Sequence, residues 1–113
     1  MPKKNPLNLN PLQLKTLTLL QVLARLPEHA APAEEPDHIR VSDLPHPHGD
    51  HFHLGDGVVA ARDASGLVNQ SVWVALERKG LMRSEFPFAA VLTPEGLAYE
   101  TGLGDSLLHR GGR

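Results

Sequence analysis

The spacing of leucines near the start of the chain predicts an amphipathic helix over residues 11–26. Asn10 is a favourable N-cap, Pro11 suits the first helical position, and Gln13 lies where a capping box places Glu or Gln. The apolar stripe of this helix contains Leu12, Thr16, Leu19, Leu23 and Leu26. Pro27 cannot continue the hydrogen-bonded turn, so we expect the helix to end just before it.

Two further helices are predicted close together in the middle of the chain. A short helix over Gly57–Ala64 has Asp56 as its cap and Gly66 as its stop. A second helix over Gln70–Lys79 has Asn69 as its cap and a glycine directly after it. Because only a short turn separates the two helices, the pair has a helix–turn–helix layout.

The last third of the chain predicts a β-hairpin followed by a helix. Leu81–Glu85 and Ala89–Leu92 are expected to be strands on either side of Phe86-Pro87-Phe88. Thr93-Pro94-Glu95 combines a cap, a proline at the first helical position and an acid in the first turn. We therefore expect a helix from this point to about Thr101.

The segment 27–53 differs from its surroundings in composition. Residues 27–57 contain seven acidic residues against Arg40 alone, together with six of the seven histidines of the chain. Prolines interrupt this segment, and its only predicted regular element is a short strand near 38–41. We expect a His-rich acidic loop at 27–53, inserted between the first helix and the helix–turn–helix.

Length and composition limit the classes of protein that need to be considered. A chain of 113 residues with 41% hydrophobic residues fits a single folded domain over 1–113, whose tail at 105–113 is expected to fray. The absence of cysteine excludes disulfides, thiolate nucleophiles and Cys-ligated metal centres. No apolar run approaches the roughly 20 residues that cross a bilayer. We therefore expect a cytoplasmic protein without a membrane partner.

The order of these elements carries a resemblance to a known family. Leu76-Glu77-Arg78-Lys79-Gly80-Leu81 precedes the hairpin, and Leu92-Thr93-Pro94-Glu95-Gly96 follows it. This pattern resembles the winged helix–turn–helix domain of bacterial regulators of the multiple-antibiotic-resistance and phenolic-acid-repressor types. The resemblance implies an α+β fold with a three-helix core, a β-hairpin wing and a C-terminal helix. It also implies a small, non-enzymatic DNA-binding or transcription-associated protein.

The resemblance gives a set of candidate DNA-binding residues at both ends of the second helix of the pair and on the hairpin. These are Asn69, Gln70, Ser71, Arg78, Lys79 and Arg83. Asn69, Gln70 and Ser71 could equally do no more than cap and solvate the helix start. The charged residues from Arg62 to Glu85 have a net charge of only +1, and neutralisation of phosphates dominates DNA affinity. One domain would bind weakly, so we expect a homodimer on duplex DNA.

A protein-interaction module without DNA binding is the competing interpretation. Wing tips that bind DNA usually carry Arg or Lys, whereas this tip is apolar, which makes Phe86 and Phe88 candidate contacts for a partner protein. Trp73 could also serve as an exposed docking residue. Apolar neighbours surround it in the sequence, so we expect it to pack in the core.

Four closely spaced histidines form the densest chemical feature of the chain: His46, His48, His51 and His53. With Asp50 they read His-x-His-x-Asp-His, which resembles the zinc motif of metallo-β-lactamase-type hydrolases. Such enzymes need a scaffold of more than about 150 residues and further ligands, so we do not expect an enzyme. The alternatives are a zinc or nickel site without catalysis, a pH-sensing loop, or a solvated loop with no specific role. If the histidines bind zinc or nickel, the DNA-binding protein or the protein-interaction module would be responsive to metal.

Overall fold

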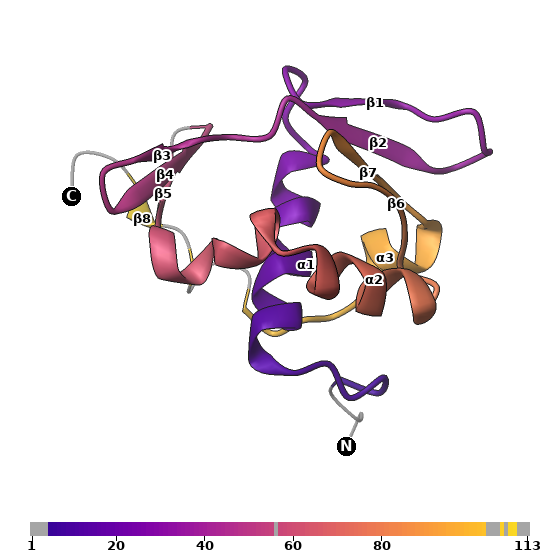
Figure 1. Ribbon diagram of the computed structural model, residues 1–113. Coiled ribbons are helices and arrows are strands. Elements are labelled where there is room, and N and C mark those ends of the chain that lie inside the picture. The colour runs from indigo at the N-terminus through magenta and orange to yellow at the C-terminus, as the bar shows by residue number, and fades with distance from the viewer. Residues whose placement is uncertain (1–4, 56, 104–106, 108, 111–113) are drawn as a thin grey trace.

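The computed structural model describes residues 5–55, 57–103, 107 and 109–110, and the fold is α+β (Figure 1). Within these residues the α-helices are α1 (Pro11–Leu23), α2 (Gln70–Arg78) and α3 (Pro94–Ala98), and the 3₁₀ turns are η1 (Ala61–Asp63) and η2 (Ser65–Val68). The strands are β1 (Ala30–Pro32), β2 (Ile39–Ser42), β3 (Pro47–His48), β4 (His51–Leu54), β5 (Gly57–Ala60), β6 (Met82–Glu85), β7 (Ala89–Leu92) and β8 (His109–Arg110).

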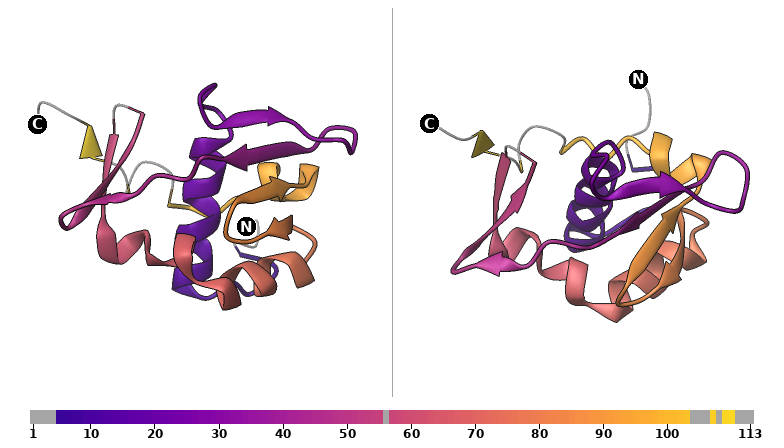
Figure 2. Two further views of the ribbon diagram at one scale, coloured as in Figure 1. Left: turned by 45° about the horizontal axis from the view of Figure 1, so that its top comes forward. Right: turned by 90° about the horizontal axis from the view of Figure 1, so that it is seen from above.

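The strands form two antiparallel sheets, with α1 between them. One sheet has the order β1-β2-β7-β6 and the other β3-β4-β5-β8. Figure 2 shows α1 between the two sheets in both views, while η1, η2 and α2 pass along one side of it. A single hydrophobic core joins these parts, because it includes Leu20 of α1, Val41 of β2, Val59 of β5 and Trp73 of α2. No helix in the described part of the chain is long and apolar enough to cross a bilayer.

The first helix confirms the prediction made from its caps. Asn10 Oδ1 accepts a hydrogen bond from the Gln13 amide at 2.8 Å, and Gln13 Oε1 accepts one from the Asn10 amide at 3.0 Å. This reciprocal pair is the capping box. The helix ends at Leu23 rather than at 26, because the chain tightens into turns in which the Leu26 amide donates to the Leu23 carbonyl at 3.1 Å.

The helix predicted over Gly57–Ala64 is wrong: this stretch is β5 followed by η1. Residues of β5 alternate between buried and half-buried, and each pairs with β4, from Leu54↔Gly57 to His51↔Ala60. Val58 and Val59 are β-branched and suit a strand that has a partner. The cap expected at Asp56 lies outside the described residues.

Gly66 belongs to η2 and contacts α1, instead of ending a helix. A Cβ atom at this position would lie 1.8 Å from Thr16 Oγ1, so only glycine lets η2 approach α1 this closely. The Gly66 carbonyl accepts a hydrogen bond from Trp73 Nε1 at 3.1 Å. Trp73 is fully buried, and its ring meets that of Phe86 edge to face at 4.9 Å. The core position predicted for Trp73 is confirmed.

The second predicted helix, the hairpin and the last helix are also confirmed, with small shifts of their ends. Asn69 caps α2, and Gly80 follows it with a φ of +77°, in the left-handed region that suits glycine. Strand β6 begins at Met82, and α3 ends at Ala98 rather than near 101. Thr93 Oγ1 accepts from the Gly96 amide at 3.0 Å, which is the predicted cap of α3.

The segment 27–53 is more than a loop. The strand expected near 38–41 is β2, and β1, β3 and β4 lie in the same segment. Strand β2 pairs with β7, from Ile39↔Leu92 to Ser42↔Ala89, so it is part of the main sheet rather than an insertion outside the fold.

In the tail, where fraying was expected, β8 pairs with β5 and Leu107 is buried. The other residues of 105–113 lie outside the described part of the chain.

Candidate functional site

Two of the candidate DNA-binding residues at the start of α2 interact with each other. Asn69 Oδ1 accepts hydrogen bonds from the Ser71 amide at 3.1 Å and from Ser71 Oγ at 2.7 Å. Ser71 and Gln70 are exposed, whereas Asn69 is half-buried. The polar atoms of Asn69 and Ser71 thus stabilise the helix start, which is the capping role that the sequence left open.

At the other end of α2, Arg78 and Lys79 have different surroundings. Arg78 is exposed. Lys79 Nζ donates to the carbonyl of Leu7 at 2.8 Å, which ties the end of α2 to the N-terminal segment. Gln70 and Arg78 lie about 12 Å apart along the helix axis. The exposed polar groups of α2 are therefore separated along the helix rather than gathered into one cationic patch.

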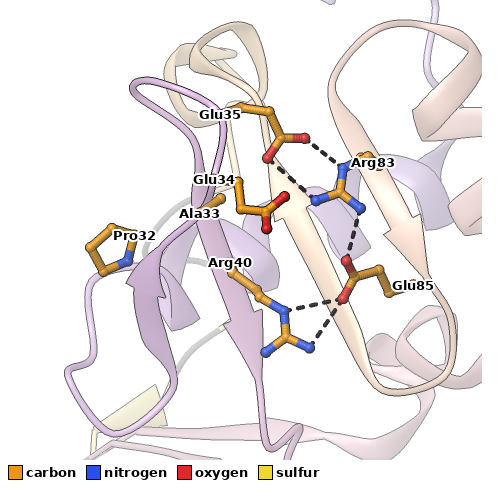
Figure 3. A pocket seen from close by; sticks show the side chains of 7 residues that line it. All are labelled: Pro32, Ala33, Glu34, Glu35, Arg40, Arg83 and Glu85. Carbon is orange, nitrogen blue, oxygen red and sulfur yellow. Dashed lines mark hydrogen bonds and ion pairs between the residues drawn. The ribbon is translucent and has the colours of Figure 1, made fainter.

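Arg83 lies in a row of ion pairs, so its charge is balanced within the molecule (Figure 3). Its Nε donates to Glu35 Oε2 at 2.6 Å and its Nη1 to Glu85 Oε2 at 2.8 Å. Glu85 Oε1 also accepts from Arg40 Nε at 3.1 Å. Figure 3 shows the alternation of carboxylate and guanidinium groups along the row. The row joins the turn between β1 and β2 to the outer strand of the hairpin.

The charges in this row shift one another's pKa values. The hydrogen bond from Arg83 holds the pKa of the Glu35 carboxyl below its ordinary value. Hydrogen bonds from Arg83 and then Arg40 do the same to the pKa of Glu85. Hydrogen bonds to both carboxylates raise the pKa of Arg83. These groups stay charged and paired near neutral pH, which leaves Arg83 poorly suited to contact phosphate.

An open cavity of about 580 Å³ adjoins the row. It is lined by Pro32, Ala33, Glu34, Glu35, Arg40, Arg83 and Glu85. Three carboxylates against two guanidinium groups give this surface a slightly acidic balance. Both arginines of this lining are paired with glutamates, so neither is an unpaired cation for a phosphate.

The tip of the hairpin borders a smaller, apolar pocket of about 310 Å³, which we call the hairpin-tip pocket. It is lined by Leu44, Pro45, His46, Leu67, Val68, Phe86, Pro87 and Phe88. Phe88 is 75% exposed and Val68 is 70% exposed, and they are the exposed large hydrophobic residues of the described chain. Phe86 is half-buried, because its ring packs on Trp73. Of the two predicted partner contacts, Phe88 is presented to solvent and Phe86 is a half-buried residue of the pocket lining.

Half of the residues that line the hairpin-tip pocket were not singled out in the sequence: Leu44, Pro45, Leu67 and Val68. Leu44 follows β2, and Leu67 and Val68 belong to η2, so the chain brings three distant segments together at this place. No local signal in the sequence marked Val68, because an apolar residue directly before a cap ordinarily packs on the fourth helical residue, here Trp73.

The four clustered histidines separate into different places. His51 and His53 lie on one face of β4, with their ring centroids 4.9 Å apart, while Phe52 and Leu54 are buried on the other face. His46 lines the hairpin-tip pocket. The side chain of His48 lies outside the described part of the structure. Among the described residues, no three His, Cys, Asp or Glu side chains come together as a metal cluster.

Neither the family models, nor the curated proteins, nor the solved structures compared with this chain include a match to it.

Proposed function

We propose that the chain is a winged-helix module that contacts protein through the hairpin-tip pocket, and that the protein it contacts is a second copy of the chain. The topology supports the winged-helix part of this proposal. The chain runs from α1 through β2 and the two 3₁₀ turns to α2 and the β6–β7 hairpin, and β2 pairs with β7. In this interpretation the hairpin is the wing, and η1 and η2 stand in place of the second helix of the family.

The chemistry of the wing favours protein over nucleic acid as the ligand, and this observation carries the proposal. The wing presents Phe88 and the hairpin-tip pocket at its tip, while the cation on its strand, Arg83, is paired with Glu35 and Glu85. Removing an apolar tip from water lowers the free energy, and such a tip offers no charge that neutralises a phosphate. The proposed function is non-enzymatic.

A second copy fits this surface for a reason of charge. No Asp, Glu, Lys or Arg lines the hairpin-tip pocket. Two copies can therefore meet face to face without placing like charges opposite each other. A two-fold contact would let each Phe88 cover the other copy's pocket, so both exposed aromatic rings leave water at once.

The expected affinity is modest. Covering Phe88 and Val68 in both copies removes about 500 Å² of apolar surface from water, which is worth about 12 kcal/mol. Lost translational and rotational freedom opposes association by about 4–15 kcal/mol, and for a contact this small we take about 6 kcal/mol, toward the lower end. The difference corresponds to a Kd of about 10–100 µM. The contact belongs to the small, transient class of interfaces.

The proposal is tested by sedimentation velocity of the full chain. Protein concentrations from about 5 to about 500 µM extend on both sides of the expected Kd. The wild-type chain should move from monomer to dimer over this range, and Phe88→Ser should remain monomeric. Ala31→Ser, an exposed position outside the pocket, should associate like the wild type. A wild-type chain that stays monomeric throughout, or a dimer that persists in Phe88→Ser, would overturn the proposal.

Duplex DNA remains a second candidate ligand, favoured by the exposed polar groups of α2, above all Gln70 and Arg78. Fluorescence anisotropy on a random duplex at low salt measures this directly. Arg78→Ala with Lys79→Ala should abolish binding and its salt dependence, whereas Arg25→Ala, an exposed arginine after α1, should not. An absence of binding at low salt would exclude this candidate.

A further inference from the structure

We propose that His51 and His53 form a two-imidazole site for a divalent first-row transition ion, with Cu²⁺ bound more tightly than Ni²⁺ or Zn²⁺. Imidazole nitrogen suits all three ions, and affinity for a given nitrogen site peaks at Cu²⁺ in this series. The site is separate from the hairpin-tip pocket and does not depend on self-association.

The strand fixes both side chains on one face. Successive residues of a strand point to opposite faces, so His51 and His53 share one face while Phe52 and Leu54 share the other. Phe52 is 4% exposed and Leu54 is 1% exposed, because both belong to the hydrophobic core. A shift of the register by one residue would bury the histidines and expose Phe52 and Leu54. The packing of the core therefore holds the two rings on the outer face.

The separation of the rings is what a shared ion requires. Their centroids lie 4.9 Å apart, with an angle of 79° between the ring planes. Two imidazoles on one ion, with metal–nitrogen bonds of about 2.0–2.1 Å and an angle of about 90–110° at the metal, have centroids about 4.5–5 Å apart. The backbone already brings the rings to this distance. Side-chain rotations that turn one nitrogen of each ring toward the ion would complete the site.

A carboxylate next to the site supports the same assignment. Asp50 Oδ1 lies 3.3 Å from His51 Nδ1. A histidine that binds a metal usually donates its other ring N–H to a carboxylate, carbonyl or water, which orients the ring and makes the ligating nitrogen more basic. With Nδ1 next to the carboxylate, Nε2 of His51 is the nitrogen that would bind the ion. The carboxylate also lowers the electrostatic cost of bringing a cation to this surface.

Access for the ion is open. The side chain of His51 is 38% exposed and His53 is exposed, so water molecules can complete the coordination. The register of β3 and β4 pairs His48 with His51. The proposal rests on the two histidines of β4 alone.

Isothermal titration of the full chain with CuCl₂, and separately with NiCl₂, tests this site. We expect one ion per chain at the site, and at least a tenfold loss of affinity in either His51→Ala or His53→Ala, since each removes one of two protein ligands. The matched control is the double variant His29→Ala with His38→Ala. These histidines also lie in the acidic segment, but each is hydrogen-bonded to a backbone carbonyl, of Ser42 and Pro36 respectively.

Two outcomes would overturn the proposal: wild-type affinity in the double variant His51→Ala with His53→Ala, or an equal loss in the control. A second measurement locates the ion independently of affinity. Substoichiometric Cu²⁺ should broaden the amide resonances of β4 before those of other strands, and it should not do so in the double variant. Circular dichroism without metal confirms that the variants are folded.

Discussion

Replacing Gly66 with alanine tests how the 3₁₀ turn η2 packs on α1. The added Cβ would lie 1.8 Å from Thr16 Oγ1 and 3.1 Å from Thr16 Cβ. Thr16 is fully buried, and its hydroxyl donates to the Leu12 carbonyl at 2.8 Å. It therefore has little space in which to rotate away, so Gly66→Ala must push η2 and α1 apart or distort Thr16.

Two opposing terms set the magnitude of this effect. Gly66 does not have a positive φ, so alanine suits its backbone and would by itself stabilise the fold by about 0.4–1 kcal/mol through the unfolded chain. Overpacking of a close-packed core costs about 1–3 kcal/mol. With an overlap this large we expect the cost near the upper end, and a net loss of about 2 kcal/mol. This loss lowers the Tm by about 8 °C for a domain of this size.

A double-mutant cycle with Thr16→Ala isolates the contact. Thr16→Ala removes the oxygen that the new Cβ meets, so Gly66→Ala should cost less than about 0.5 kcal/mol in that background, which is a coupling of at least about 1.5 kcal/mol. Urea unfolding followed by the fluorescence of Trp73, the one tryptophan of the chain, measures all four free energies of unfolding. A cost of Gly66→Ala that is the same in both backgrounds would refute the proposed packing.

Two further predictions concern the ion-pair row and the N-terminal segment. Hydrogen bonds from Arg83 lower the pKa of Glu85 in the folded chain below 4.5, so its stabilising effect is present above that pH and is lost as the pH falls through the folded value. The range from pH 6 to 3 spans the ordinary carboxyl pKa. Over this range the Tm of the wild type should therefore fall more steeply than the Tm of Glu85→Gln. The control Glu77→Gln changes an exposed glutamate and should follow the wild type. Tyr99→Phe removes the hydroxyl that accepts a hydrogen bond from the Leu7 amide at 3.0 Å. The loss of this bond should lower the free energy of unfolding by about 1 kcal/mol and speed hydrogen exchange at the Leu7 amide. Unchanged exchange would show that the bond does not hold the N-terminal segment.

Local signals were sufficient for the elements that carry their own caps. The reciprocal bonds of Asn10 and Gln13, the Asn69 cap and the Thr93 cap are made within a few residues of the helix they begin, so the sequence alone predicts them. The same holds for the hairpin, whose two strands are neighbours along the chain.

Partner residues outside the predicted helix decided the two features that were predicted wrongly. Val58 and Val59 form a strand because β4 lies beside them, and a helical interpretation of the same residues cannot include that partner. A glycine at position 66 is typical of the residue that ends a helix, yet here it allows η2 to pack closely against Thr16 of α1. A glycine that ends a helix and one that allows close packing look the same in a single sequence.

The candidate sites show the same division. Arg83 counts as a free cation in the sequence, but Glu35, 48 positions away, and Glu85 balance it. Because alternate residues of a strand share one face, the bounds of β4 are enough to place His51 and His53 together. His46 lies apart from them, in the lining of the hairpin-tip pocket. Long-range contacts therefore determined the surroundings of Arg83 and His46, whereas local strand geometry determined those of His51 and His53.

Amide chemical shifts in a dilution series of the ¹⁵N-labelled chain, from about 20 µM to 1 mM around the expected Kd, test the central claim most directly. The account predicts shifts that depend on concentration and are confined to the lining of the hairpin-tip pocket, with Leu44, Leu67, Val68 and Phe88 among the largest, and it predicts none in Phe88→Ser. Shifts that do not change with concentration, or that fall on α2 while the pocket stays unchanged, would contradict it.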